Sequence, residues 1–172
     1  MTTKATITES GMKFGPYQSD CFFQIEKSDA YAAVREGVKI ADFLLLQQST
    51  LLVVEAKSSV SNPETQGGED FDKNIADICE QLINAFSLGW ASRLGRHPKS
   101  AKELPKAFKN LDLRTVQVRF VLVIKAHKEE WLSRVNEVMK KALRPTVKTW
   151  GLGPNSVLVL NDKGARKHKL IA

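Results

Sequence analysis

The chain has 172 residues, 42% of them hydrophobic and 26% charged, which is enough for one domain with a substantial core. No apolar run reaches the roughly 18 residues that a membrane span needs, and the polar start is not a signal peptide. A net charge of +7 suits a polyanion such as nucleic acid, although solvated surface lysines produce the same excess. We therefore expect a single cytoplasmic domain of residues 1–172 with no membrane partner.

The first part of the chain has little periodicity. Residues 1–20 are weakly patterned, with turns expected at Gly11 and at the Gly15-Pro16 pair. Cys21–Glu26 is predicted as a short strand that ends in a charge. Lys27–Glu36 fits either a short helix or a wide connection, and Gly37 breaks it before a more apolar region.

The most apolar region is predicted to form a β hairpin. Val38–Leu46 and Leu51–Val54 flank a short polar break, as hairpin strands do. Asp42, Glu55 and Lys57 lie in or directly after these runs, although burying an unpaired charge costs several kcal/mol. Ionisable groups in such a setting are candidates for a functional site.

Strand geometry predicts how these groups are arranged. The two-residue period puts Glu55 and Lys57 on one face of the second strand. A loop of two or four residues sets Asp42 directly across from Glu55, close enough for both carboxylates to share a divalent cation. A loop of three residues would instead set Asp42 opposite Ala56, on the wrong face unless a bulge restored it.

The rest of the chain alternates helical and extended patterns. In chain order we predict a loop (Ser58–Glu69), a helix (Phe71–Leu94), a basic segment (Gly95–Asp112), a strand (Thr115–Lys125), a helix (Glu129–Leu143, ended by Pro145), a strand (Ser156–Leu160) and a basic tail (161–172). Central strands that are apolar on both faces need helices on both sides. The expected fold class is therefore α/β, a mixed sheet between helical layers.

The hairpin charges indicate a chemistry. Two close carboxylates raise one another's pKa unless a cation lies between them. Carboxylate oxygens suit Mg²⁺ or Mn²⁺, and Lys57 would project beside such an ion to orient a water or stabilise a phosphate. This combination is typical of metal-assisted phosphodiester hydrolysis. The alternative is a salt-bridged cluster of Lys57 with Glu55 or Asp42 that only holds the hairpin.

The pattern at these residues resembles the PD-(D/E)xK nuclease superfamily, which has the restriction-endonuclease-like fold. Asp42 is followed by twelve residues and then by Glu55-Ala56-Lys57, with the acid and the ExK sequence on successive strands and a helix after them. The order of elements is similar from about Phe22 to Leu160. Ala41 stands where the motif's name has proline.

The resemblance implies a role for each residue of the motif. Asp42 and Glu55 would ligate Mg²⁺ or Mn²⁺, the carbonyl group of Ala56 would add a ligand, and Lys57 would be the catalytic lysine.

Members of the superfamily often carry two further polar groups near this motif. One is an upstream acid, for which Glu26 is the candidate metal ligand and Glu36 the competitor. The other is a polar residue on the helix after the ExK strand, for which Gln81 is the candidate.

The function that the resemblance implies is a metal-dependent endonuclease, with DNA favoured over RNA, in bacterial defence or repair. The alternatives are a non-catalytic nucleic-acid-binding module and a protein-interaction domain with the same fold. Cutting both strands of a duplex with one site per chain implies a homodimer or a partner subunit. The sequence leaves that choice and the target specificity open.

Overall fold

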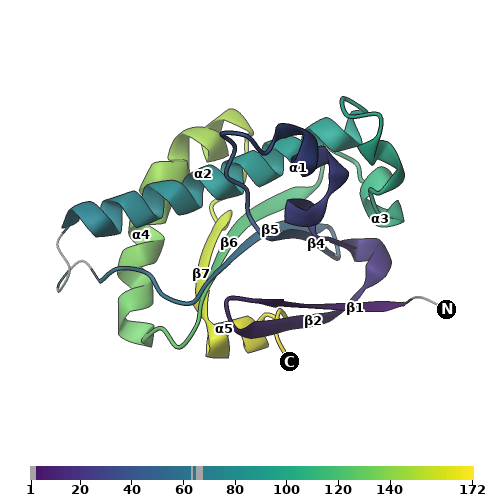
Figure 1. Ribbon diagram of the computed structural model, residues 1–172. Helices are drawn as coiled ribbons and strands as arrows, with labels where there is room; N and C mark the ends of the chain where they lie inside the picture. The colour runs from purple at the N-terminus through teal and green to yellow at the C-terminus, as the bar shows by residue number, and fades with distance from the viewer. Residues whose placement is uncertain (1–2, 63, 65–67) are drawn as a thin grey trace.

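A five-stranded mixed sheet forms the centre of the computed structural model, which describes residues 3–62, 64 and 68–172 (Figure 1). Part of the predicted loop Ser58–Glu69, residues 63 and 65–67, lies outside the described residues. The strands, in their order across the sheet, are β3 (Phe22–Phe23), β4 (Phe43–Gln47), β5 (Thr50–Lys57), β6 (Gln117–Ile124) and β7 (Val157–Asn161). The β3–β4 and β4–β5 pairs are antiparallel, whereas β6 runs parallel to β5 and β7 parallel to β6. The predicted mixed α/β class is therefore confirmed.

Helices cover one face of this sheet. The long helices α2 (Gly68–Arg93) and α4 (Glu129–Thr149) pack there with the short helices α1 (Asp29–Val34) and α3 (Lys106–Lys109). Alternate residues of β5 face this layer, for example Leu51 and Val53. Helix α2 comes so close to the sheet that a Cβ on Gly89 would lie 2.7 Å from a Leu44 methyl carbon.

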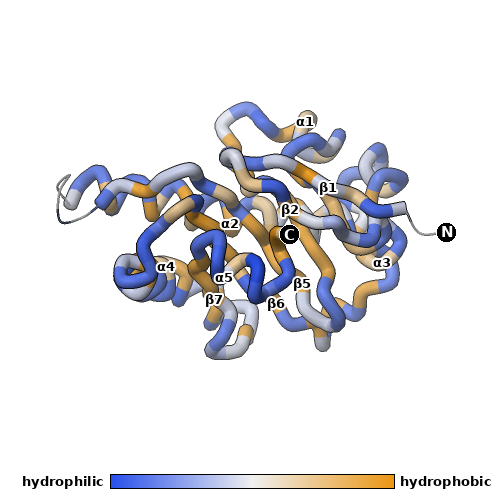
Figure 2. Tube along the Cα trace, turned by 90° about the horizontal axis from the view of Figure 1, so that it is seen from below, coloured by the Kyte–Doolittle hydropathy of each residue, from blue (hydrophilic) through white to orange (hydrophobic). Residues whose placement is uncertain are grey.

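A β hairpin and a short helix cover the other face. The hairpin consists of β1 (Lys4–Glu9) and β2 (Met12–Gln18), and the helix is α5 (Asp162–Lys167). The Phe14 ring of the hairpin packs edge-on against Phe43 of the sheet at 5.3 Å between ring centres. Figure 2 shows hydrophobic residues along the inner strands, with hydrophilic residues along α4 and α5 on the outside. The second layer thus differs from the helical layer that we predicted.

Both ends of the chain contribute to this second layer, contrary to the sequence-based expectation for the N-terminal end. The side chains of Ile7 on β1 and of Met12 and Phe14 on β2 are buried in the core, and the residues next to them on each strand are mostly exposed. Ser10 and Gly11 both have positive φ, 49° and 73°, as a two-residue hairpin turn requires. Most of the segment 1–20, for which we expected only weak patterning, therefore forms this hairpin. The turn expected at Gly11 is confirmed, whereas the turn expected at Gly15-Pro16 is wrong, because both residues lie inside β2. The basic tail is likewise ordered, because its apolar end, including Leu170, is buried against the hairpin.

Two predicted strands are shorter than expected. Cys21–Glu26 forms only β3 and then a 3-10 turn at Ile25–Lys27, so Glu26 does not end a strand. Residues 38–42 precede β4 without strand structure. The backbone of residues 39–41 makes hydrogen bonds to α2 in place of a neighbouring strand.

Helix α4 is longer than expected because it continues through Pro145 to Thr149. Proline removes one helical hydrogen bond and normally ends or kinks a helix. Here the proline is exposed, so water can reach the carbonyl group that lost its partner. Leu143 and Val147 on either side still pack on the core, and this packing favours the continued helix.

None of the helices in the described residues has both the length and the hydropathy of a membrane span.

Candidate active site

Asp42 and Glu55 lie across from each other where the β4–β5 ladder ends. Phe43 pairs with Val54, and the strands are joined by a two-residue turn, so the predicted even-length loop and its register are confirmed. One further step in that register sets Asp42 opposite Glu55. Both side chains are buried, with 8% of Asp42 and 2% of Glu55 exposed.

The last residues of β5 extend past β4, and side chains of the site satisfy the backbone there. The backbone N–H of Ala56 donates to Asp42 Oδ2 at 2.7 Å. The carbonyl oxygen of Ala56 accepts from the hydroxyl of Ser10, in the β1–β2 turn, at 2.9 Å. On its other edge β5 stays paired with β6 up to Lys57. The early end of β4 therefore frees a strand edge that Asp42 and the hairpin turn occupy.

Lys57 forms an ion pair with one oxygen of Glu55. The distance from Lys57 Nζ to Glu55 Oε1 is 2.6 Å, and the lysine side chain is 33% exposed. The second oxygen, Glu55 Oε2, is buried and has no hydrogen-bond partner among the described residues. Leaving a buried charged acceptor unpaired is costly, so this oxygen is suited to hold a cation.

Two more carboxylates converge on Asp42. One oxygen each of Glu9, Glu26 and Asp42 lie within 4.8 Å of one another. Glu9 ends β1, and Glu26 lies in the 3-10 turn, where its backbone N–H approaches the carbonyl oxygen of Asp42 at 3.5 Å. The structure thus places the predicted upstream acid Glu26 at the site, whereas its competitor Glu36 is exposed in the turn after α1.

Sequence reasoning missed Glu9. The signal that would have identified its strand is the Ser10-Gly11 pair, a common hairpin turn, between two stretches with alternating apolar residues. That pattern predicts the hairpin but not its location. Only the packing of the hairpin on the sheet brings Glu9 to Asp42.

Burial and the crowding of acids raise the pKa values of the group. Burial raises the pKa of Asp42 to about 8, and the charges of Glu55, Glu9 and Glu26 add to the rise, whereas the Ala56 N–H opposes it. Burial also raises the pKa of Glu55, against the lowering effect of Lys57. Burial and the neighbouring Glu26 raise the pKa of Glu9. Without a cation, Asp42 therefore keeps a proton at neutral pH, because four ionised carboxylates with one lysine would repel one another.

The donor set fits a hard divalent cation. Mg²⁺ and Mn²⁺ prefer carboxylate, carbonyl and water oxygens, and two carboxylates with a backbone carbonyl group are a common protein contribution. Glu9, Glu26 and Asp42 bring one oxygen each within 4.8 Å of one another and can offer such carboxylate ligands. Glu55 lies opposite Asp42, and its Oε2, which has no hydrogen-bond partner among the described residues, can add a further oxygen. The Ala56 carbonyl oxygen already accepts a hydrogen bond from Ser10.

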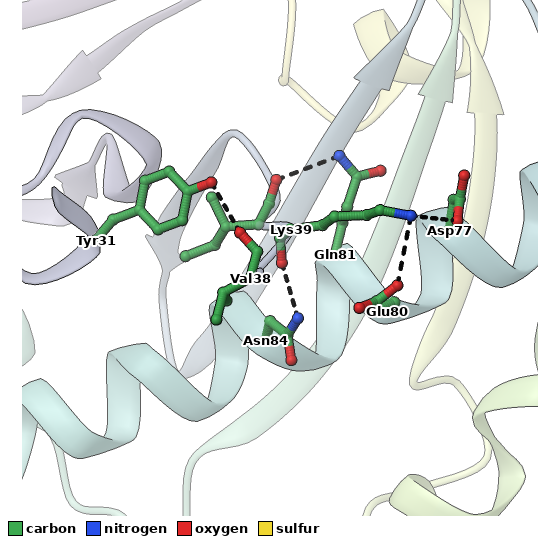
Figure 3. A network of polar contacts seen from close by, with 8 residues as sticks. Tyr31, Val38, Lys39, Asp77, Glu80, Gln81 and Asn84 are labelled. Carbon is green, nitrogen blue, oxygen red and sulfur yellow. Dashed lines mark hydrogen bonds and ion pairs between the residues drawn. The ribbon is translucent and has the colours of Figure 1, made fainter. Parts of the chain in front are cut away.

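Helix α2 holds the backbone just before Asp42 (Figure 3). The side-chain amide of Gln81 donates to the carbonyl oxygen of Ile40 at 3.3 Å. The N–H of Ala41 donates to the carbonyl oxygen of Gln81 at 3.1 Å. The structure therefore gives Gln81 a contact that positions the chain two residues before Asp42. Its predicted catalytic role stays a prediction.

Neighbouring contacts hold the same segment at two more points. Asn84 on α2 donates to the carbonyl oxygen of Lys39 at 2.8 Å, and Tyr31 donates to that of Val38 at 2.9 Å. The Lys39 ammonium pairs with Asp77 at 2.7 Å. These bonds replace the strand ladder that residues 38–41 lack.

No described protein family, curated protein or solved structure matches the chain.

Proposed function

We propose that this chain is a Mg²⁺- or Mn²⁺-dependent nuclease that hydrolyses the phosphodiester bonds of nucleic acid, with DNA favoured over RNA. One observation carries the proposal. Asp42 and Glu55 form a buried pair in which one oxygen, Glu55 Oε2, has no hydrogen-bond partner in the described part of the chain, and the pair lies beside Lys57 and two further acids at one end of the sheet. This arrangement agrees with the PD-(D/E)xK pattern of the sequence, and the net charge of +7 suits a polyanionic substrate.

The residues divide into two kinds of role. Asp42, Glu55 and the Ala56 carbonyl group would hold the cation, and Glu9 and Glu26 lie beside it as further oxygen donors. When bound, the ion would neutralise the acids, polarise the phosphodiester and lower the pKa of a coordinated water.

Lys57 is suited to act on the phosphate. Its ion pair with Glu55 fixes the ammonium at the boundary between the buried acids and solvent. From there it can donate a hydrogen bond to a phosphate oxygen, where negative charge develops as water adds to phosphorus and the P–O bond breaks. A preorganised cation at that point stabilises the transition state more than the ground state.

The charges of these residues do not fit a purely structural cluster. A cluster that only held the hairpin would pair its charges, whereas here the acids raise one another's pKa and Lys57 pairs with Glu55 alone among the described residues. Such an arrangement lowers the stability of the metal-free fold. It is therefore better explained by cation binding than by stability.

A cleavage panel tests the proposal. Single-stranded DNA, double-stranded DNA and RNA are each incubated with Mg²⁺ or Mn²⁺ and the wild-type protein, Asp42→Asn or Lys57→Ala. We expect each substitution to lower the cleavage rate by at least about a hundredfold, as for removal of one transition-state donor. Asparagine at position 42 keeps an acceptor for the Ala56 N–H and so preserves that contact.

Asp72→Asn is the matched control, because Asp72 is exposed on α2 and the chemical change is the same. It should cleave at the wild-type rate. Equal activity in all four proteins would indicate a contaminating nuclease. No cleavage by wild type under any condition, with salt-sensitive binding retained, would favour the non-catalytic binding module.

A further inference from the structure

Lys125 is the first residue after β6, and its backbone is held beside the proposed site. Its N–H donates to the carbonyl oxygen of Lys57 at 2.9 Å. The next residue, Ala126, has a φ of 51°, a conformation that costs a non-glycine residue about 1 kcal/mol or more. The Ala126 N–H donates to Asp162 Oδ1 at 2.6 Å, which holds this turn. Lys125 therefore leaves the sheet at a fixed point next to Lys57.

The side chain of Lys125 lies against the β1–β2 turn. A Cβ on Gly11 would lie 2.6 Å from Lys125 Nζ, closer than two such atoms can approach. The neighbouring Ser10 binds the Ala56 carbonyl group, and Glu9 belongs to the acidic group. In this hairpin Gly11 thus lies against the Lys125 ammonium, Ser10 binds a proposed ligand carbonyl group, and Glu9 lies among the other acids.

The Lys125 ammonium is available to an anion. The side chain is exposed, and no carboxylate in the described part of the chain forms an ion pair with it. Lys57, in contrast, already forms an ion pair with Glu55. Fixing a lysine side chain costs up to about 2 kcal/mol of conformational entropy, and here no internal ion pair compensates that cost.

We propose that Lys125 binds a backbone phosphate of the nucleic-acid strand where the β1–β2 turn meets the site, on the hairpin side of the sheet, and that Gly11 is needed because any side chain there would displace the ammonium. The proposal rests on the proposed nuclease function and adds a substrate-binding residue outside the ExK motif. Its ligand is the phosphodiester group, which DNA and RNA share.

Salt-dependent binding tests this role. Dissociation constants for single-stranded DNA, double-stranded DNA and RNA oligonucleotides are measured from 50 to 200 mM salt, with Ca²⁺ in place of Mg²⁺. One lost phosphate contact reduces the slope of log affinity against log salt by about 0.7 for single strands and about 0.9 for duplex DNA. We expect Lys125→Gln to show this reduction and to bind several-fold more weakly on at least one of these substrates.

Lys4→Gln is the matched control. It removes the same charge from the exposed start of β1, roughly 16 Å from Glu9 along an extended strand. We expect it to keep the wild-type slope. An unchanged slope in Lys125→Gln, or an equal reduction in Lys4→Gln, would overturn the proposal, since charge alone would then explain the binding.

A second variant tests the part of the proposal that concerns Gly11. We expect Gly11→Ala to reproduce the affinity loss of Lys125→Gln, and the double variant to lose no more than Lys125→Gln alone. Additive losses would mean that Gly11 acts independently of Lys125. Thermal unfolding of each variant shows whether a loss reflects unfolding, because alanine is also strained at the positive φ of 73°.

Failure of this inference is distinguishable from failure of the nuclease proposal. The affinities are measured without cleavage, so an inactive wild-type protein would overturn the nuclease function and leave the binding result standing. Cleavage by wild type together with an unchanged slope in Lys125→Gln would overturn only the role of Lys125.

Discussion

At Asp42, burial and the neighbouring carboxylates act in the same direction on one ionisable group. They raise its pKa to about 8, whereas the same side chain in an unfolded chain titrates near 4. The folded protein therefore keeps a proton on Asp42 over a pH range in which the unfolded chain has released it. Stability must then fall as the pH rises through this range, because the folded state binds more protons.

We predict that Asp42→Asn removes this dependence. Near pH 4 the metal-free wild type and variant should be about equally stable, since Asp42 is neutral in the folded protein and asparagine is always neutral. Near pH 8.5 the variant should be more stable by one to a few kcal/mol. Denaturant unfolding in a chelator at both values measures the difference. A wild type that gains stability over the variant as the pH rises would contradict the raised pKa.

The β1–β2 hairpin is the element that completes the acidic group. Its turn docks on the end of β5 through Ser10, and its buried face packs on the sheet through Phe14 and Tyr17. The Tyr17 hydroxyl also donates to the carbonyl oxygen of Leu170 near the end of the chain. The hairpin is therefore held at both ends, and this packing brings Glu9 to the site, where the side-chain amide of Gln24 donates to Glu9 Oε1 at 3.5 Å.

We predict that Glu9→Gln weakens Mn²⁺ binding by at least about tenfold, because groups that only orient metal ligands already contribute about 10- to 100-fold. Isothermal titration calorimetry measures the affinity. Glu36→Gln is the control, since it removes the same charge from an exposed turn outside the acidic group. If both variants bound Mn²⁺ as tightly as wild type, Glu9 would have no part in the metal site.

In the whole molecule, the site lies where separate parts of the fold meet. The sheet supplies Asp42 and Glu55, the hairpin layer supplies Glu9, and the helical layer positions the approach to Asp42 through Gln81. A cation held between these parts would link them. Because a ligand that binds only the folded state stabilises it, the link should be visible as thermal stability.

We predict that Mg²⁺ or Mn²⁺ raises the melting temperature by several degrees at a hundredfold excess over the dissociation constant, equivalent to about 2.7 kcal/mol. The rise should be larger at pH 8 than at pH 6, since protons compete with the cation for carboxylates of raised pKa. Scanning calorimetry with and without chelator measures it, and Asp42→Asn should lose most of the rise. If the melting temperature stayed the same with and without metal at both pH values, the result would favour a purely structural cluster.

Several elements could be predicted because their causes are local. The β4–β5 hairpin, α2 and β6 follow from apolar periodicity and a polar break, and the structure has all three. Strand ends were predicted less well because they depend on neighbours. Residues 39–41 bond to α2 instead of to a strand. Pro145 stays helical because the residues around it pack on the core.

The sequence by itself determined that Glu55 and Lys57 share one face of their strand, and that a turn of even length would set Asp42 opposite Glu55; the two-residue turn of the structure decided for that register. A two-residue strand period and a short turn set cross-strand neighbours without help from the rest of the chain. Only the tertiary structure decided that Glu9 joins the acids and that Lys125 lies on Gly11. Both depend on how the N-terminal hairpin packs on the sheet, and contacts between residues distant in sequence, such as Phe14 with Phe43, fix that packing.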